Sequence, residues 1–149
     1  MSETDKRSGS CLCGSVRFEV SVPDPRLGVC HCGMCRRWSA GPFFAVHSPE
    51  AATFQQEGEL SWYQASPWAE RGFCRKCGSS LFYRLVEQRD GMVIVSAEAL
   101  DDTSGLALGQ HIYLDSKPGY YEFADDCPRL TEQEFLAAMG VAPDGDASS

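Results

Sequence analysis

Residues 73–83 read FCRKCGSSLFY and join a pair of cysteines to a short aromatic segment. Cys74 and Cys77 are separated by two residues and followed by Gly78, a spacing common to one half of a zinc site. The glycine relieves crowding where backbone N–H groups turn toward the two thiolates. Because a closed tetrahedral site needs four ligands, this segment predicts a second half elsewhere in the chain.

The second half is predicted at residues 11–14, which read CLCG. Cys11 and Cys13 form a tighter pair that is also followed by a glycine and then by a predicted strand. Together the two pairs offer four thiolates, and a shared metal would tie the first predicted strand to the middle of the chain. The spacing indicates a metal site, but it does not establish which cysteines share the metal.

A third group of cysteines lies in VCHCGMCRRW, residues 29–38. Its members Cys30, Cys32 and Cys35 fix three corners of a tetrahedron. A catalytic zinc typically has three protein ligands and an exchangeable fourth position, so water or a substrate is expected at the open corner. Three other residues are alternatives that would close the site and make it structural: His31, His111 and Cys127.

Two of these alternatives have a simpler interpretation. His31 stands between two of the cysteines, so we expect its ring to point away from the metal. Cys127 precedes a proline in an acidic segment, and a lone cysteine is more often a small packing residue than a ligand.

The composition predicts one globular domain that does not act on nucleic acid or at a membrane. The chain has 149 residues, of which 43% are hydrophobic, enough for a real core. Its formal net charge of -8 disfavours nucleic acid and anionic membranes as partners, because both attract clustered Lys and Arg. The first ten residues are polar and no apolar run could span a bilayer, so we expect a cytoplasmic protein. Cysteines in that compartment stay mostly reduced, which favours metal binding over disulfides.

The residue pattern predicts a mainly β chain. In VRFEV (16–20), Val16, Phe18 and Val20 alternate with polar residues, as in a half-buried strand. Seven further strands are predicted at 42–48, 52–57, 60–64, 71–74, 79–85, 92–100 and 110–114.

One helix is predicted, over residues 131–140, where Thr131 and Glu134 form a capping box and Gly140 provides the end. Residues 21–28 (SVPDPRLG) read as a turn-rich connection. Flexible tails are expected at 1–9 and 141–149.

Four segments taken together resemble the family of glutathione-dependent formaldehyde-activating (Gfa-like) proteins, which includes centromere protein V. In chain order they are CLCGSVRFEV (11–20), CHCGMCRRWSAGPF (30–43), FCRKCGSSLFY (73–83) and HIYLDSKPGYYEF (111–123). Seven cysteines at matching positions make the resemblance specific. It implies a single domain at 10–140 with a β-tent-like fold of small coiled antiparallel sheets held by zinc.

The resemblance also implies two zinc ions and a reaction. The structural zinc would lie on Cys11, Cys13, Cys74 and Cys77. The catalytic zinc would lie on Cys30, Cys32 and Cys35, with its open position facing the substrate. The implied reaction joins glutathione and formaldehyde into S-hydroxymethylglutathione, or reverses this, as a carbon–sulfur lyase.

Four residues are candidates for substrate binding: Arg36, His111, Ser116 and Lys117. Arg36 directly follows a cysteine and would suit a bidentate pair with a glutathione carboxylate. His111 would suit proton transfer to a developing alkoxide, and Ser116 with Lys117 would shape the rim. Each also has a structural interpretation: an exposed arginine, a hydrogen-bonded strand histidine, or ordinary loop residues.

The chain departs from the family pattern near this rim. Tyr120 stands where the family usually has Trp, and residues 125–128 read DDCP in place of DGLP. These changes leave the substrate open. Two other functions are therefore kept as alternatives: a non-catalytic zinc module with two structural zincs that serves a protein partner, and a redox or metal-buffering thiol protein.

Overall fold

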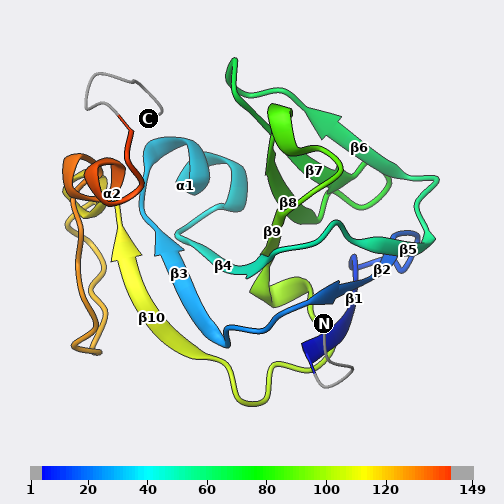
Figure 1. The fold of residues 1–149 in the computed structure, drawn as a ribbon, viewed down its shortest axis with the longest axis horizontal. Coiled ribbons are helices and arrows are strands. Elements are labelled where there is room, and N and C mark those ends of the chain that lie inside the picture. The colour runs from blue at the N-terminus through cyan, green and yellow to red at the C-terminus, as the bar shows by residue number, and fades with distance from the viewer. Residues whose placement is uncertain (1–4, 142–149) are drawn as a thin grey trace. The chain divides into compact units, whose positions relative to one another are not determined.

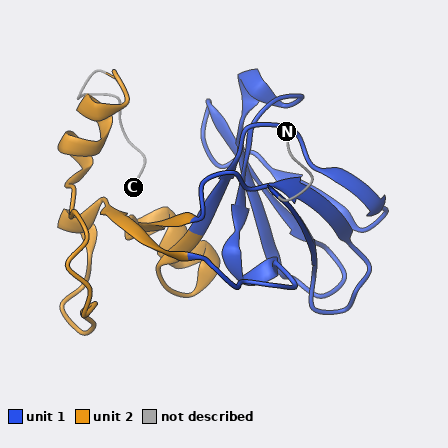
Figure 2. Ribbon diagram, turned by 60° about the horizontal axis from the view of Figure 1, so that its bottom comes forward, with its two compact units in different colours: residues 1–25, 45–106 blue, residues 26–44, 107–149 orange. Residues whose placement is uncertain are grey.

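The computed structural model describes residues 5–141 and divides the chain into two compact units (Figures 1 and 2). Unit 1 consists of residues up to 25 together with 45–106, and unit 2 of residues 26–44 together with 107 onward. Each unit takes chain from two separate stretches, so neither can be cut from the sequence as one piece. The outer parts of the predicted tails, 1–4 and 142–149, lie outside the described residues.

The larger sheet of unit 1 is antiparallel, with the strand order β4-β9-β8-β7-β6. Its strands are β4 (Phe43–Ser48, of which residues 45–48 belong to unit 1), β6 (Leu60–Tyr63), β7 (Ala69–Cys74), β8 (Ser80–Leu85) and β9 (Val93–Ser96). All five overlap strands that were predicted from the sequence. The strand predicted at 92–100 is shorter than expected, because the chain turns into a 3-10 helix at Ala97–Ala99. A second 3-10 helix, Val86–Gln88, follows β8.

A second, three-stranded antiparallel sheet in unit 1 has the order β1-β2-β5. Its strands are β1 (Lys6–Ser10), β2 (Arg17–Ser21) and β5 (Thr53–Gln56). β1 lies where a flexible tail is expected, because KRSGS carries no apolar alternation. Gly9 explains its position: a Cβ atom there would lie 2.4 Å from the Phe18 ring, so only glycine lets this backbone cover the ring.

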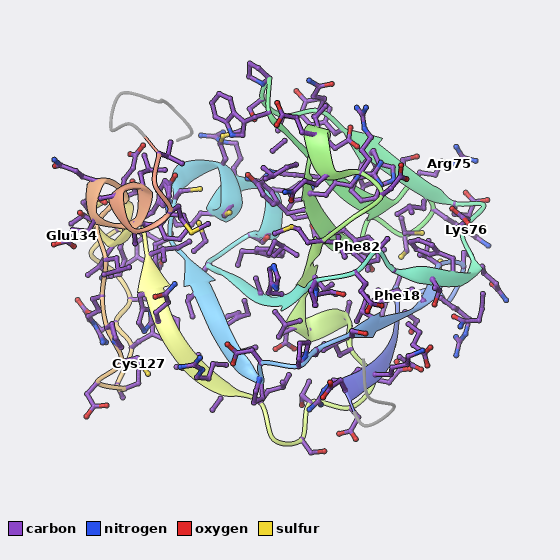
Figure 3. The ribbon with its side chains drawn as sticks, viewed as in Figure 1. Phe18, Arg75, Lys76, Phe82, Cys127 and Glu134 are labelled. Carbon is purple, nitrogen blue, oxygen red and sulfur yellow. The ribbon has the colours of Figure 1, made fainter. Side chains whose placement is uncertain are left out.

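Aromatic rings from both sheets form the core of unit 1. Phe18 and Phe82 are fully buried and meet edge to face, with ring centroids 4.8 Å apart (Figure 3). Trp62 stacks on Phe82 at 5.9 Å, and Phe54 packs against both phenylalanines. The buried face of β2 is the one that the alternation of VRFEV predicts.

Two parallel strands form the centre of unit 2. β3 (Arg26–Cys30) pairs with β10 (Ala107–Ile112), and the two run side by side in Figure 1. β3 begins inside the segment 21–28 that was expected to be a connection, so that prediction is wrong from Arg26 onward. The ladder shifts register next to Gly109, whose Cβ would lie 2.8 Å from the Cβ of Arg26.

Two short helices complete unit 2. α1 (Gly33–Ser39) was not expected; it begins directly after β3 with Cys32 as its N-cap and ends at Ala40, which takes a left-handed conformation. After β10 a 3-10 helix covers Leu114–Ser116. α2 (Glu132–Ala138) confirms the predicted C-terminal helix, including the capping box between Thr131 and Glu134.

The described chain is therefore mainly β, with two α-helices of seven residues each. None of the helices within residues 5–141 has the length and apolar character that crossing a membrane requires.

Candidate metal centres

Four cysteines of unit 1 converge at one place. Cys11 and Cys13 lie in the loop between β1 and β2, Cys74 ends β7, and Cys77 lies in the turn that leads to β8. Their four sulfur atoms all lie within 4.8 Å of one another. The structure thus brings together the two cysteine pairs that the sequence analysis proposed as partners.

The spacing of these sulfurs fits a zinc ion. With Zn–S bonds of about 2.3 Å, two thiolates of a tetrahedral site lie about 3.8 Å apart. The Sγ of Cys13 lies 3.7 Å from that of Cys11 and 3.8 Å from that of Cys74. The four sulfur ligands and these two sulfur–sulfur distances therefore fit a closed four-thiolate site.

Each half of this cluster closes in a turn that ends at a left-handed glycine, over four residues in the first pair and five in the second. Gly14 and Gly78 have φ of +83° and +82°, and each donates its N–H to the carbonyl of the first cysteine of its pair. In the first pair the N–H of Val16 donates to Cys11 Sγ at 3.3 Å; in the second, Cys77 N–H donates to Cys74 Sγ at 3.4 Å. The predicted role of the glycines is thereby explained: their left-handed conformation closes a turn in which N–H groups face sulfur.

Serine hydroxyls support the more exposed sulfurs. Ser15 Oγ lies 3.3 Å from Cys13 Sγ, and Ser79 Oγ lies 3.2 Å from Cys77 Sγ. Hydrogen bonding by Ser79 lowers the pKa of Cys77 to about 5, and hydrogen bonding by Ser15 lowers that of Cys13. Burial raises the pKa of Cys74 to about 11. A cation is thus needed to hold all four groups as thiolates at neutral pH.

The second cluster comes from one continuous segment of unit 2. Cys30 ends β3, Cys32 caps α1, and Cys35 lies in its first turn, with all three sulfurs within 4.8 Å of one another. The N–H of Cys35 donates to Cys32 Sγ at 3.3 Å. Hydrogen bonds with Cys32 and Cys35 and burial raise the pKa of Cys30 well above its usual value. Three crowded thiols of this kind become thiolates together only when a metal ion compensates their charge.

No fourth ligand atom joins this cluster from the described residues of unit 2. His31 uses both ring nitrogens elsewhere: Nδ1 lies 2.9 Å from the Tyr121 hydroxyl and Nε2 lies 2.9 Å from His111 Nδ1. Cys127 lies beside β10 and donates its thiol to the Leu108 carbonyl at 3.3 Å (Figure 3). The three residues considered as closing ligands are therefore engaged in other contacts.

The predicted substrate residues lie in unit 2, and the structure gives each of them protein partners. Arg36 donates from Nε to the His31 carbonyl at 2.9 Å and from Nη2 to the Ser116 carbonyl at 3.1 Å. Lys117 donates to the carbonyls of Pro118 and Tyr121 and to the Glu122 carboxylate, and only 12% of its side chain is exposed. Lys117 therefore holds the segment 118–122 in place.

His111 is almost completely buried and belongs to a longer line of hydrogen bonds. Its Nδ1 meets His31, and its Nε2 lies 3.0 Å from Asp125 Oδ1. Burial lowers the pKa of His31 to about 4, together with the neighbouring basic groups, of which His111 has the largest effect. Burial alone would raise the pKa of Asp125, but hydrogen bonds from His111 and the Cys127 N–H lower it to about 2.

Tyr121 and Asp125 were not predicted from the sequence as members of this group. Asp125 was noted only as part of a departure from a familiar pattern, and Tyr121 gave no signal beside the exposed Tyr120. The position of His31 could have indicated this group. A histidine between two cysteine ligands points its ring away from the metal, where it needs hydrogen-bond partners, and His111 and Tyr121 on later segments could provide them.

Comparison with known proteins places this chain among relatives of one family. The family model described as glutathione-dependent formaldehyde-activating enzyme matches residues 6–116. A Halomonas elongata protein named "Putative glutathione-dependent formaldehyde-activating enzyme" is 36% identical over 126 residues, covering 76% of this chain and 78% of that protein. An "uncharacterized lyase" of Schizosaccharomyces pombe is 27% identical over 131 residues, covering 88% of this chain and 95% of the relative.

A solved structure supports the fold alone. A Rhodobacter sphaeroides protein superimposes with a TM-score of 0.54 at 22% identity, covering 68% of this chain and 98% of that one. The family match extends over most of the chain and includes all seven clustered cysteines. This chain belongs to the family of glutathione-dependent formaldehyde-activating enzymes.

Proposed function

We propose that this protein is a zinc-dependent carbon–sulfur lyase that forms or cleaves the adduct of a small thiol and a small aldehyde. S-hydroxymethylglutathione, made from glutathione and formaldehyde, is the proposed adduct. The observation that carries the proposal is the three-cysteine cluster, which lacks a fourth ligand within the described part of unit 2. The family and the names of two relatives support the reaction class.

The two clusters have different proposed tasks. Cys11, Cys13, Cys74 and Cys77 would hold a structural zinc, because four thiolates complete its coordination. Cys30, Cys32 and Cys35 would hold the catalytic zinc, and this ion when bound would favour the thiolate form of the incoming thiol at neutral pH.

The chemical step follows from thiol and carbonyl reactivity. In the forming direction, the thiolate sulfur attacks the carbonyl carbon, a C–S bond forms, and the C=O π pair moves to oxygen, which takes up a proton. In the cleaving direction, the hydroxyl loses its proton, the C=O bond re-forms, and sulfur leaves with the C–S pair. Holding both reactants at one site makes the attack local and oriented.

The surrounding residues of unit 2 would supply charge and position. Arg36 adds positive charge beside three thiolates, and its two backbone contacts keep the guanidinium in place. The Ser116 carbonyl accepts a hydrogen bond from Arg36, and Lys117 fixes the rim segment that carries Tyr121. His111 is buried, so we assign it a positioning role through His31 in place of a direct substrate contact.

Exchange spectroscopy by NMR tests the proposal. Carbon-13 formaldehyde and glutathione form the adduct without an enzyme, so the measured quantity is the rate of exchange between free and bound formaldehyde with and without protein. We expect acceleration by the zinc-loaded wild type and by Cys127→Ser, whose cysteine lies outside both clusters, and none by Cys32→Ser. A zinc-loaded wild type that does not accelerate exchange would favour the non-catalytic zinc module.

A further inference from the structure

Four polar side chains of unit 2 form one continuous line of hydrogen bonds. The Tyr121 hydroxyl lies 2.9 Å from His31 Nδ1, His31 Nε2 lies 2.9 Å from His111 Nδ1, and His111 Nε2 lies 3.0 Å from an Asp125 oxygen. Both histidines are at most 1% exposed. Phe123 packs edge-on against both imidazole rings, so the middle of the line is shielded from water. Each hydrogen bond in this line contains one hydrogen. Which of the two atoms carries that hydrogen sets the donor-to-acceptor direction of the line.

The carboxylate end sets that direction. An ionised carboxylate only accepts hydrogen bonds, so His111 Nε2 carries a hydrogen and donates it to Asp125. Asp125 is held as an acceptor on its other side as well: Oδ2 receives the Cys127 N–H at 3.0 Å, and Arg129 Nη1 lies 3.6 Å away. Because Arg129 already balances the charge of this carboxylate, a second cation at His111 is not required.

The remaining hydrogens follow from neutral histidines. A neutral imidazole has one N–H, so His111 Nδ1 is an acceptor and His31 Nε2 must donate to it. His31 Nδ1 is then also an acceptor, and the Tyr121 hydroxyl donates to it. The facing nitrogens of His31 and His111 lie 2.9 Å apart, so only one of them carries a hydrogen, and the burial of both rings disfavours a charged imidazolium in either.

We propose that Tyr121 contacts the substrate as a hydrogen-bond acceptor, and that Asp125 enforces this orientation through His111 and His31. The only hydrogen of the Tyr121 hydroxyl points into the protein, so the phenolic oxygen offers lone pairs to what lies outside. The group it recognises is an O–H or N–H donor. In a thiol–aldehyde adduct, that donor is the hydroxyl on the carbon next to sulfur.

Tyr121 is placed for this contact. Its hydroxyl bonds to His31, which lies between Cys30 and Cys32 in the sequence, and Arg36 donates to the carbonyl of the same histidine. Lys117 fixes the residue from the other side, with Nζ 2.6 Å from the Tyr121 carbonyl and 5.1 Å from the centre of its ring. The identity of the substrate rests on the proposed function, whereas the direction of the line does not.

The first experiment reads the direction without substrate. Long-range proton–nitrogen NMR of zinc-loaded protein at neutral pH identifies the nitrogen of each histidine that carries hydrogen. We expect Nε2–H for both His31 and His111. Nδ1–H at His31 would overturn the proposal, because the Tyr121 hydrogen would then point outward.

A variant of the same shape should reverse the line. In Asp125→Asn, the amide oxygen is expected to keep the Cys127 N–H, which turns the NH₂ group toward His111 Nε2. Both histidines should then switch to Nδ1–H, and kcat/KM for the adduct should fall although zinc stays bound. If kcat/KM falls but the nitrogen pattern is unchanged, Asp125 acts through the fold and the proposed relay of orientation is wrong.

The second experiment tests the contact itself. Tyr121→Phe removes the acceptor and should lower kcat/KM for S-hydroxymethylglutathione roughly tenfold, the loss of one hydrogen bond to a buried group. Binding of S-methylglutathione, which has no hydroxyl, should be unchanged. Tyr63→Phe, on an exposed tyrosine of β6, is the matched control. An active wild type and an equally active Tyr121→Phe would contradict the contact, whereas an inactive wild type would contradict the proposed function and leave the NMR result standing.

Discussion

Both cysteine clusters contain a Cys-x-x-Cys pair, but the chain takes a different conformation after each pair. After Cys74 and Cys77, Gly78 takes a left-handed conformation and the chain turns back into β8. After Cys32 and Cys35 comes Arg36, which continues the turn as helix α1. In both, the fifth residue donates its N–H to the carbonyl of the first cysteine. The residue after the second cysteine therefore decides whether the pair ends in a turn or begins a helix.

The clusters also differ in how much chain they connect. The four-cysteine cluster joins two loops of unit 1 that are far apart in sequence, whereas the three-cysteine cluster lies within six consecutive residues. A metal in the first constrains the fold, and a metal in the second adds little to it. This contrast is the physical basis for assigning one site to structure and the other to chemistry.

The largest effect on stability is expected from Cys74→Ser. Cys74 is fully buried, and loss of its thiolate would release the zinc ion proposed to link the two loops of unit 1. We expect a loss of more than about 3 kcal/mol in the free energy of unfolding and a decrease in Tm of about 10 °C. Thermal unfolding and zinc content measure this. Cys127→Ser is the control, and equal Tm values for the two variants would contradict a structural role of the cluster.

Cys32→Ser should have the opposite profile. Serine remains a good N-cap, so helix α1 should stay intact while the second metal is lost. We expect lyase activity to fall at least about 100-fold, with a change in Tm below about 3 °C. Kinetic assays and thermal unfolding of the same sample measure the two effects. Loss of folding in this variant would show that the second cluster is structural too.

Removal of metal should occur in two phases. A chelator can attack the open position of the three-cysteine cluster, whereas four thiolates would complete the coordination of a zinc ion at the other. We expect one equivalent of zinc to be released at least about tenfold faster than the second, followed with a colorimetric zinc indicator. The fast phase should be absent from Cys32→Ser. A single phase in the wild type would mean that the clusters do not differ in access.

The smallest effect is expected at the glycine that ends the Cys74 turn. Gly78→Ala introduces a methyl group into open space. The loss in the free energy of unfolding therefore comes only from holding an alanine in the left-handed backbone conformation. We expect about 1 kcal/mol and a decrease in Tm of about 2–4 °C. Gly58→Ala, at a glycine with open space and no positive φ, should change the free energy of unfolding by less than about 0.5 kcal/mol. Equal effects at both positions would contradict the role given to the turn.

Much of the fold was predictable because its signals are local. The alternation of VRFEV identified the buried face of β2, and the capping box identified α2. The pairing of Cys11 and Cys13 with Cys74 and Cys77 followed from equivalent motifs and from coordination number. These features depend on residues close in sequence or on fixed metal chemistry.

The remaining features depend on contacts that have no local signal. β1 forms because its backbone pairs with β2 and because Gly9 fits against Phe18, and β3 forms because β10 lies beside it. The line from Tyr121 to Asp125 joins three segments of unit 2, so only the folded chain brings its members together. Arg36 and Lys117 were expected at a substrate, and their several backbone contacts became visible only in the structure.

Native mass spectrometry of the reduced protein, with and without glutathione, tests the central claim most directly. The claim is that the three-cysteine cluster holds a metal with a position open to a thiol. We predict two zinc ions per chain and a glutathione adduct for the wild type, and one zinc ion without an adduct for Cys32→Ser. A wild type with two zinc ions that binds no thiol, or a second zinc ion that persists in Cys32→Ser, would contradict it.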